Sequence, residues 1–252
     1  MFQEIFIRPL YNGLVIIMNV VPGIDVGVAV IIFTVIVRLI LFPLSKSALL
    51  TQVRMKEVEP EANKIKAQYA ADKQLQAAKT MELYKQRGVH PFSGILLLFI
   101  QLPILFALIS VFYKIIPTID PTLLYSFVHV PTIKATLLGL DLTHKSLILA
   151  LVTGVVQFLQ LHYSVASRQQ RNIAQNMPKN AGKPDSATNF ANSMNTQMKF
   201  MMPIVAFASI YWLIPSRYPQ AASIIAIYWS ISALFTFGQE LYIRKKHLKG
   251  LV

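Results

Sequence analysis

Five apolar segments along the chain are each long enough to cross a lipid bilayer as a helix, which takes about 17–25 residues. They occupy residues 25–44, 93–113, 146–166, 198–215 and 222–243. The fourth has the shortest uninterrupted apolar stretch, because Lys199 and Pro203 lie within it. The pattern predicts an all-α membrane protein with five transmembrane helices.

The N-terminal segment, residues 1–24, is also apolar, but Arg8, Pro9 and Asn12 interrupt it. The apolar stretch that remains, from Leu10 to Val21, is too short to cross a bilayer comfortably. A short helix of this kind with one apolar face is typical of the membrane surface. We therefore predict an amphipathic helix that lies in the membrane interface.

Residues 45–92 are polar, yet their apolar residues recur with the spacing of a helix. They fall into two stripes, Ala62, Ile65 and Tyr69, and Ala77, Met81 and Tyr84. Residues 70–73 are typical of a turn, and Gly88 with Pro91 is typical of the end of a helix. The segment therefore predicts a helical hairpin, with a solvated, charged extension that contacts nothing as the alternative.

The distribution of Lys and Arg assigns a side of the membrane to each polar segment. Of the 24 Lys and Arg residues, eighteen lie in or beside the hairpin, the Asn- and Gln-rich connector 167–197 and the basic tail 244–252. Five lie in residues 1–24, the Pro-containing loop 114–145 and the turn between the last two spans. Because basic loops remain in the cytoplasm, we predict a cytoplasmic C-terminus and an N-terminus outside.

The composition supports a membrane protein and excludes several other classes. The chain is 54% hydrophobic and 14% charged, against roughly 25% charged residues in soluble domains. Its net charge of +13 is spread over loops rather than one face, so specific recognition of nucleic acid is not expected. The chain has no cysteine, its five histidines are scattered, and it lacks a glycine-rich phosphate loop. We expect no metal, no cofactor and no enzymatic chemistry.

Arg38 lies inside the first apolar segment, where a guanidinium costs at least ~2.5–3.5 kcal/mol. It is eight residues from Lys46, so its side chain could simply reach the nearer membrane surface. Polar residues at helical spacing in the other segments favour a different interpretation, a hydrated groove around this charge. The candidate groove residues are Arg38, Thr34, Gln101, Thr153, Gln157, Gln160, Ser164, Trp212, Tyr228 and Ser232.

Hydrogen bonding between helices is the alternative role for these polar residues, since Ser, Thr and Gln commonly join membrane helices. It does not account for Arg38, because no acidic residue lies deep in any apolar segment. Asp25 and Glu240 are at segment ends. We therefore favour a groove in which Arg38 attracts a negatively charged group.

Several segments, in order and at the right spacing, resemble the YidC family of membrane protein insertases. They are residues 38–44 (RLILFPL), 60–69, 72–74, 81–85, 88–91, 98–108 (LFIQLPILFAL), 140–143, 201–203 and 227–229. The resemblance covers nearly the whole chain. Two departures are His90, where the family usually has Asn before a proline, and residues 215–220, where it has a tighter turn with glycine.

The resemblance implies five transmembrane helices around a hydrophilic groove that is open to the cytoplasm, in a bacterial cytoplasmic membrane. It places the family's groove arginine at Arg38 and its groove glutamine at Gln160, with Gln157 as the alternative. It further implies a minimal member without a large outer domain, which inserts newly synthesised membrane proteins and helps them fold. The ribosome and the Sec translocon would be partners, and no cofactor is used. A small-anion transporter that uses Arg38 and a non-autonomous translocon subunit remain alternatives.

Overall fold

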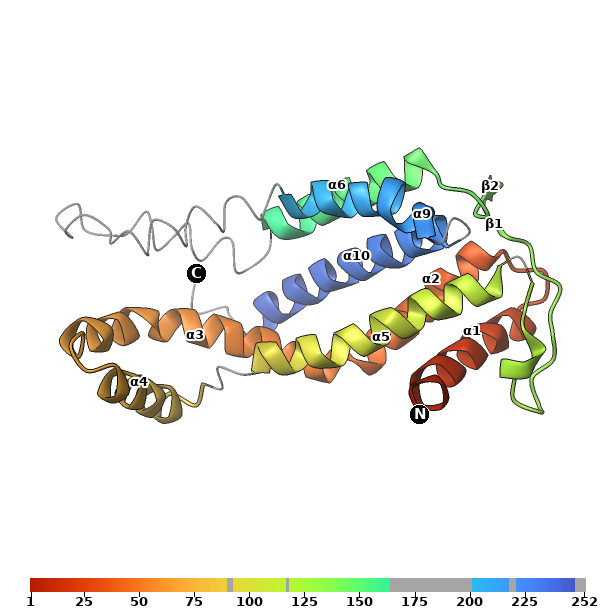
Figure 1. The fold of residues 1–252 in the computed structure, drawn as a ribbon. Helices are drawn as coiled ribbons and strands as arrows, with labels where there is room; N and C mark the ends of the chain where they lie inside the picture. Colours follow the sequence, from red (N-terminus) through yellow and green to blue (C-terminus); the bar gives the residue numbers. More distant parts are fainter. Residues whose placement is uncertain (90–92, 117, 164–200, 218–220, 248–252) are drawn as a thin grey trace.

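The computed structural model describes residues 1–89, 93–116, 118–163, 201–217 and 221–247, and these are mostly helical. The helices form an elongated bundle (Figure 1). Helices α3 (Phe42–Gln68) and α4 (Lys73–Gln86) project beyond one end, which we call the hairpin end. The loop between α5 (Ser93–Ile115) and α6 (Leu147–Tyr163) covers the other end, which we call the loop end. The predicted all-α class is correct.

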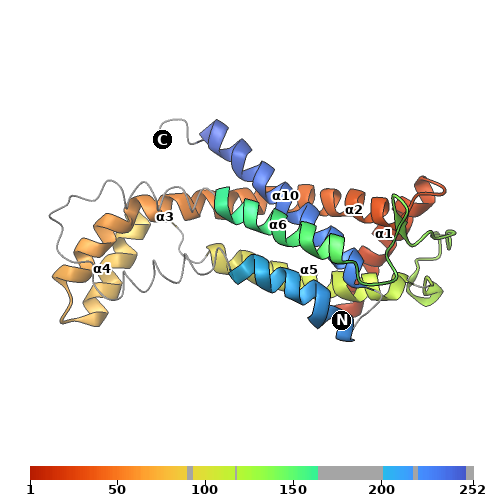
Figure 2. The ribbon, with the colours of Figure 1, turned by 90° about the horizontal axis from the view of Figure 1, so that it is seen from above.

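Helix α10 (Ala222–His247) occupies the centre of the bundle and packs against both α2 (Val26–Ile40) and α6. Every residue from 221 to 228 is buried. A helix that is buried on all sides must be apolar or small all round, and this stretch consists mainly of Ala and Ile. Figure 2 shows α10 crossing between α6 and α2, with its C-terminal end diverging from the bundle.

By length and composition, one helix among the described residues could cross a membrane alone, Ala222–Ile243 of α10. Helix α2 and the start of α3 would together form a second spanning helix if the two are counted as one bent span. Shorter apolar helices occupy Leu102–Ile115, Leu147–Tyr163 and Met201–Ser216. The five predicted spans therefore remain a prediction, although an apolar helix lies at each of the five positions.

A bend of 58° divides the first predicted span, residues 25–44. Helix α2 ends at Ile40, and α3 begins at Phe42. Pro43 lies in the first turn of α3. Proline has no N–H to donate, and its ring clashes with the carbonyl four residues earlier, so α2 cannot continue through it. The proline expected at the end of the span therefore turns the chain into the hairpin.

Helices α3 and α4 form a hairpin with a small core of its own, made of Val58, Ala62, Leu83 and Val89. The carboxylate of Asp72 accepts hydrogen bonds from the N–H groups of residues 74 and 75 and thereby caps α4. Gly88 has φ +62° at the other end of α4. The N–H of Val89 donates to the carbonyl of Tyr84 at 2.8 Å, which completes a glycine-dependent helix end.

The buried face of α4 agrees only in part with the stripe that the sequence predicted, because Tyr84 packs against the hairpin core but its two partners do not. Ala77 and Met81 are exposed, and Leu83 is buried instead. Two polar contacts also join α4 to α3. Gln76 donates to the carbonyl of Lys66 at 2.6 Å, and Arg87 pairs with Glu61 at 2.6 Å.

Helix α1 (Arg8–Val20) follows a π-helical turn η1 (Gln3–Ile7) and packs on α2 and α5. Its buried residues Tyr11, Leu14, Val15 and Met18 follow helical spacing. The Tyr11 hydroxyl accepts the backbone N–H of Asp120 at 2.7 Å, and burial raises the pKa of this phenol to about 12.

The buried side chain of Asn12 joins α1 to the loop after η2 (Pro121–Leu123). Its amide nitrogen donates to the carbonyl of Leu123 at 2.9 Å, and its amide oxygen accepts from the N–H of Tyr125 at 2.7 Å. One side chain thus satisfies two backbone groups of the loop. The asparagine that interrupts the apolar N-terminal segment is therefore a docking residue.

A two-stranded antiparallel sheet, β1 (Thr136–Leu137) and β2 (Leu140–Asp141), lies in the same loop and was not predicted. Leu138 and Gly139 form its turn with positive φ angles of 50° and 86°. A Cβ on Gly27 of α2 would lie 2.5 Å from the Cβ of Leu137. Glycine at the start of α2 therefore allows β1 to lie directly on that helix.

We expect Asn12→Ala to lower the free energy of unfolding by about 2 kcal/mol, because it leaves two buried backbone groups without partners. Asn19→Ala is the matched control. Asn19 is on the same helix but makes one exposed hydrogen bond, to the carbonyl of His129, and its loss should cost less than about 0.5 kcal/mol. Denaturant unfolding in detergent micelles measures both, and equal losses would contradict the assigned role of Asn12.

Candidate functional site

Arg38 lies in the last turn of α2, where the helix dipole favours a positive charge. Its side chain is partly buried, and within the described residues it makes no hydrogen bond or ion pair. Thr34, one turn earlier, is buried and donates to the carbonyl of Val30 of its own helix at 2.6 Å. Among the residues that the structure describes, Arg38 is thus a cation at the hairpin end without a polar partner.

Gln157 and Gln160 lie on α6, both partly buried. Helices α2 and α6 both run from the loop end toward the hairpin end (Figure 1). The two glutamines and Arg38 therefore share the half of the bundle that adjoins the hairpin. Ser164 lies outside the described residues, and the side chain of Gln101 is not described.

Thr153 is fully buried between α6 and α10. Its hydroxyl lies 2.9 Å from the Ser230 hydroxyl, 3.1 Å from the carbonyl of Ala226 and 2.8 Å from that of Leu149. Thr153 therefore joins two helices by hydrogen bonds and does not line a groove, which is the alternative role that the sequence left open for these polar residues. Ser230 was not among the predicted residues, because a single sequence does not say which residue of another helix faces Thr153.

Tyr228 and Ser232 lie on α10 and are both buried. The ring of Tyr228 packs against Phe112 of α5 with centroids 5.9 Å apart, inside the main apolar core. The Ser232 hydroxyl is buried without a hydrogen-bond partner within the described residues. Of the two, Ser232 is the one with unused hydrogen-bonding capacity.

Trp212 lies at the opposite end of the bundle from Arg38. It belongs to the π-helical turn η3 (Ser209–Leu213), is 61% exposed and lines a pocket at the loop end. The segment Met201–Ser216 runs toward the loop end, and Trp212 is near its end, whereas Arg38 is at the far end of α2. The structure therefore separates these two members of the predicted site by the length of the bundle.

A polar contact at the hairpin end joins α10 to the bend after α2. The side-chain amide of Gln239 donates to the carbonyl of Phe42 at 3.3 Å, and the rings of Phe42 and Tyr242 lie 6.1 Å apart. The site near Arg38 therefore lies beside the point where the hairpin joins the bundle. Movement of the hairpin would change the surroundings of Arg38.

The loop end carries acidic groups held by hydrogen bonds. The Thr143 hydroxyl and N–H each donate to the Asp141 carboxylate at 2.7 Å, and the His144 ring lies 3.2 Å from it. The hydrogen bonds of Thr143, and secondarily His144, hold the pKa of Asp141 below its ordinary value. Thr122 lowers the pKa of Asp120 in the same way.

Large apolar side chains are exposed along one side of the bundle. Exposed large apolar residues follow the outer face of α6 and the segment 201–213: Leu147, Ile148, Leu151, Val152, Val155, Leu159, Met201, Met202, Ile204, Val205 and Leu213. A contiguous apolar surface of this kind is typical of contact with lipid or with another protein. The fold and its surface define a helical membrane protein.

The family described as "60Kd inner membrane protein" matches residues 17–249. A relative from Fusobacterium nucleatum, named "Membrane protein insertase YidC", is 32% identical over 220 residues, which are 87% of this chain and 86% of that protein. One of the same name from Clostridium tetani is 29% identical over 90% of this chain and 86% of its own length. The chain belongs to the YidC family, and the family indicates a bacterial inner membrane.

Other relatives are longer than this chain. A protein named "Membrane protein insertase YidC" from Wolinella succinogenes is 26% identical over 87% of this chain, but the match covers 33% of that relative. The shared part is therefore the helical region described above. The resemblance inferred from the sequence is confirmed at the level of the family.

We expect Thr153→Val to lower the free energy of unfolding by about 1 kcal/mol, the range measured for hydrogen bonds between membrane helices. Thr34→Val is the matched control, because the Thr34 hydroxyl bonds only within its own helix. Its replacement should change stability by less than about 0.5 kcal/mol. Unfolding in mixed micelles distinguishes the two, and an equal cost would show that the contact between α6 and α10 contributes little.

We also expect the stability of the loop end to depend on pH through Asp141. A carboxylate with a lowered pKa contributes stability above its ordinary pKa of about 3.9. That contribution is lost as pH falls through the lowered value. Thr143→Val should raise the pKa of Asp141, measured by carbon NMR of labelled aspartate, while Thr122→Val should leave it unchanged. No change in Thr143→Val would refute the assigned cause.

Proposed function

We propose that this chain is a membrane protein insertase, which brings short polar or acidic ends of newly synthesised membrane proteins into the bilayer. Membership of the YidC family supports this function, and relatives carry that name. The observation that carries the proposal is Arg38, a partly buried cation without a hydrogen bond or ion pair among the described residues. A permanent charge in that setting suits a transient negative partner.

The cost of bringing a carboxylate into the bilayer and the gain from pairing it with Arg38 are of the same order of magnitude. A carboxylate at the centre of a bilayer costs about 2.5–3.5 kcal/mol on insertion scales. Two opposite charges 4 Å apart gain about 4 kcal/mol at an effective dielectric constant of 20. In a hydrated groove the effective dielectric constant approaches that of water, where the same pair gains only about 1 kcal/mol. One arginine there offsets part of the cost of drawing one acidic side chain part of the way in. The apolar part of the substrate then moves into lipid without help.

The proposed groove opens toward the hairpin end. Residues 221–228 of α10 are buried on all sides, whereas Leu234, Leu241 and Tyr242 further along are 44–49% exposed within the described part of the chain. The bundle is therefore closely packed at the loop end and looser near Arg38. Gln157, Gln160 and the Ser232 hydroxyl would supply its polar wall.

We place the hairpin end in the cytoplasm and the loop end outside, with five spans and α1 in the interface. The excess of Lys and Arg in the hairpin and in the segments around 167–197 and 244–252 supports this orientation. The apolar buried face of α1 suits a helix that lies along the bundle at the membrane surface. Nascent chains would arrive on the cytoplasmic side, so the ribosome and the Sec translocon are the proposed partners.

We expect Arg38→Ala to reduce insertion of a single-span substrate with an acidic tail about fivefold, the equivalent of about 1 kcal/mol. A neutral-tailed version of the same substrate should lose much less. Arg38→Lys should be milder, because it keeps the charge. Protection of the tail from added protease in proteoliposomes provides the measurement.

Arg54→Ala is the control for loss of an arginine, since Arg54 lies exposed on α3. It should leave the ratio between acidic and neutral tails unchanged. Equal losses for both tails in Arg38→Ala would show that charge attraction is not the mechanism. Uptake of a small anion that depends on Arg38 would favour a transporter instead.

A further inference from the structure

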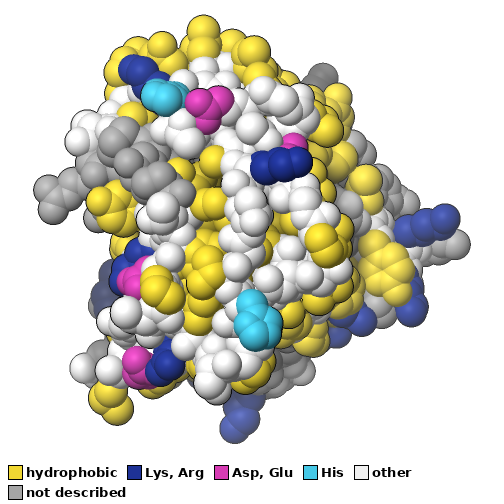
Figure 3. Space-filling view, turned by 90° about the vertical axis from the view of Figure 1, so that its right-hand side faces the viewer, with side chains coloured by type: hydrophobic (Ala, Val, Ile, Leu, Met, Phe, Trp, Pro, Cys, Tyr) yellow, Lys and Arg dark blue, Asp and Glu magenta, His cyan; other side chains and the backbone are white. Residues whose placement is uncertain are grey.

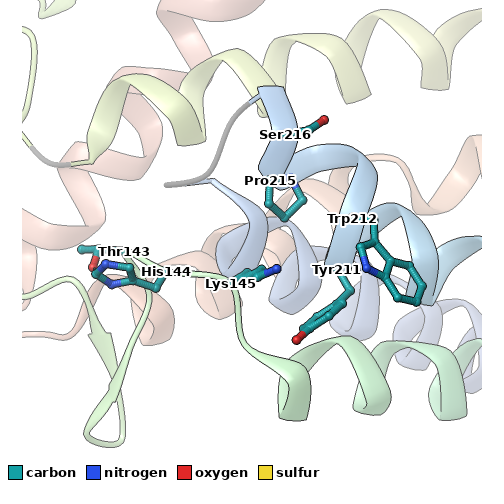
Figure 4. A pocket seen from close by; sticks show the side chains of 7 residues that line it. All are labelled: Thr143, His144, Lys145, Tyr211, Trp212, Pro215 and Ser216. Atoms are coloured by element: carbon teal, nitrogen blue, oxygen red, sulfur yellow. The ribbon is translucent and has the colours of Figure 1, made fainter.

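A pocket of about 460 Å³ lies at the loop end, far from Arg38. It is formed where the residues before α6 meet the end of the segment Met201–Ser216, and is lined by Thr143, His144, Lys145, Tyr211, Trp212, Pro215 and Ser216. Figure 4 shows the Lys145 side chain extending toward Tyr211, with Trp212 beyond it and Ser216 turned away. The proposed insertion mechanism uses none of these side chains.

Lys145 is the uncompensated charge of this pocket. Its ammonium nitrogen lies 4.5 Å from the centre of the Tyr211 ring, and it forms no ion pair within the described residues. An ammonium over an aromatic face is held in place but keeps donors for a further ligand. The nearby Asp141 carboxylate is already occupied by Thr143 and His144. The pocket therefore favours an anion.

The surroundings of the pocket are those of a membrane surface. Directly next to it, the outer faces of α6 and of η3 expose Leu147, Ile148, Leu151 and Leu213. Trp212 and Tyr211 are the residue types that lie at the level of lipid headgroups. Figure 3, which views the loop end, shows apolar side chains crowding its upper rim beside scattered charged ones. An anion here would be attached to apolar chains.

We propose that this pocket binds the phosphate headgroup of an anionic phospholipid in the outer leaflet. The phosphate contacts the Lys145 ammonium, the indole of Trp212 borders the headgroup, and the acyl chains lie along the exposed residues of α6 and of the segment 201–213. The site is separate from the insertion groove. It fixes the depth of the loop end in the membrane.

The test measures lipid binding by the purified full chain in a neutral detergent, with native mass spectrometry as the readout. Phosphatidylglycerol and phosphatidylcholine with identical acyl chains are titrated separately. We expect preferential binding of phosphatidylglycerol, and we expect Lys145→Gln to weaken it about fivefold. Trp212→Ala should weaken it as well. Lys134→Gln is the control, because Lys134 is an exposed lysine of the same loop that does not line the pocket.

Three results would overturn the proposal. The first is equal binding of the two lipids by the wild-type chain, and the second is an equal effect of Lys145→Gln and Lys134→Gln. The third is displacement of phosphatidylglycerol by millimolar inorganic phosphate, which would indicate a site for free anions. An unchanged thermal midpoint in each variant shows that binding, and not folding, is being compared. Insertion activity does not enter the readout.

Discussion

The packing of α10 between α2 and α6 is the contact on which the other helices depend. Residues 221–228 at its start are all buried, and small residues there allow both neighbours to approach closely. Apolar side chains gain little by leaving lipid for the surface of another helix, because lipid tails are equally apolar. Close packing and interhelical hydrogen bonds must therefore hold the helices together. The Thr153–Ser230 contact is such a bond. This arrangement fixes α2, and with it Arg38, relative to the glutamines of α6.

The same packing gives the two ends of the bundle different properties. At the loop end, Tyr11 and Asn12 dock α1 onto a structured loop, and Gly27 lets β1 lie on α2. At the hairpin end, a proline turns the chain away, α10 diverges, and the hairpin makes a small core of its own. The loop end is thus closely packed and the hairpin end less so, and the proposed one-sided entry of substrates would use this difference.

The sequence predicted the helices and the hairpin turn because those depend on local spacing and on Gly, Pro and Asp at helix ends. It did not predict partners across helices. The periodicity that grouped Thr153 with Gln157 was real, yet Thr153 faces α10 and Gln157 is partly exposed. Trp212 was predicted to belong to the groove, but its position near the end of a helix takes it to the loop end. Helix α2 ends earlier than the predicted span, because Pro43 cannot donate the backbone hydrogen bond that would continue the helix. The apolar pattern used to predict the span does not include this effect.

The proposed function requires that this chain lowers the barrier for a polar tail to enter the bilayer. The most direct measurement uses proteoliposomes that contain only this chain and a short, single-span substrate with an acidic tail. We expect the translocated tail to become protected from protease well above the level in empty liposomes of the same lipid composition. Protection equal to that in empty liposomes would contradict autonomous insertion.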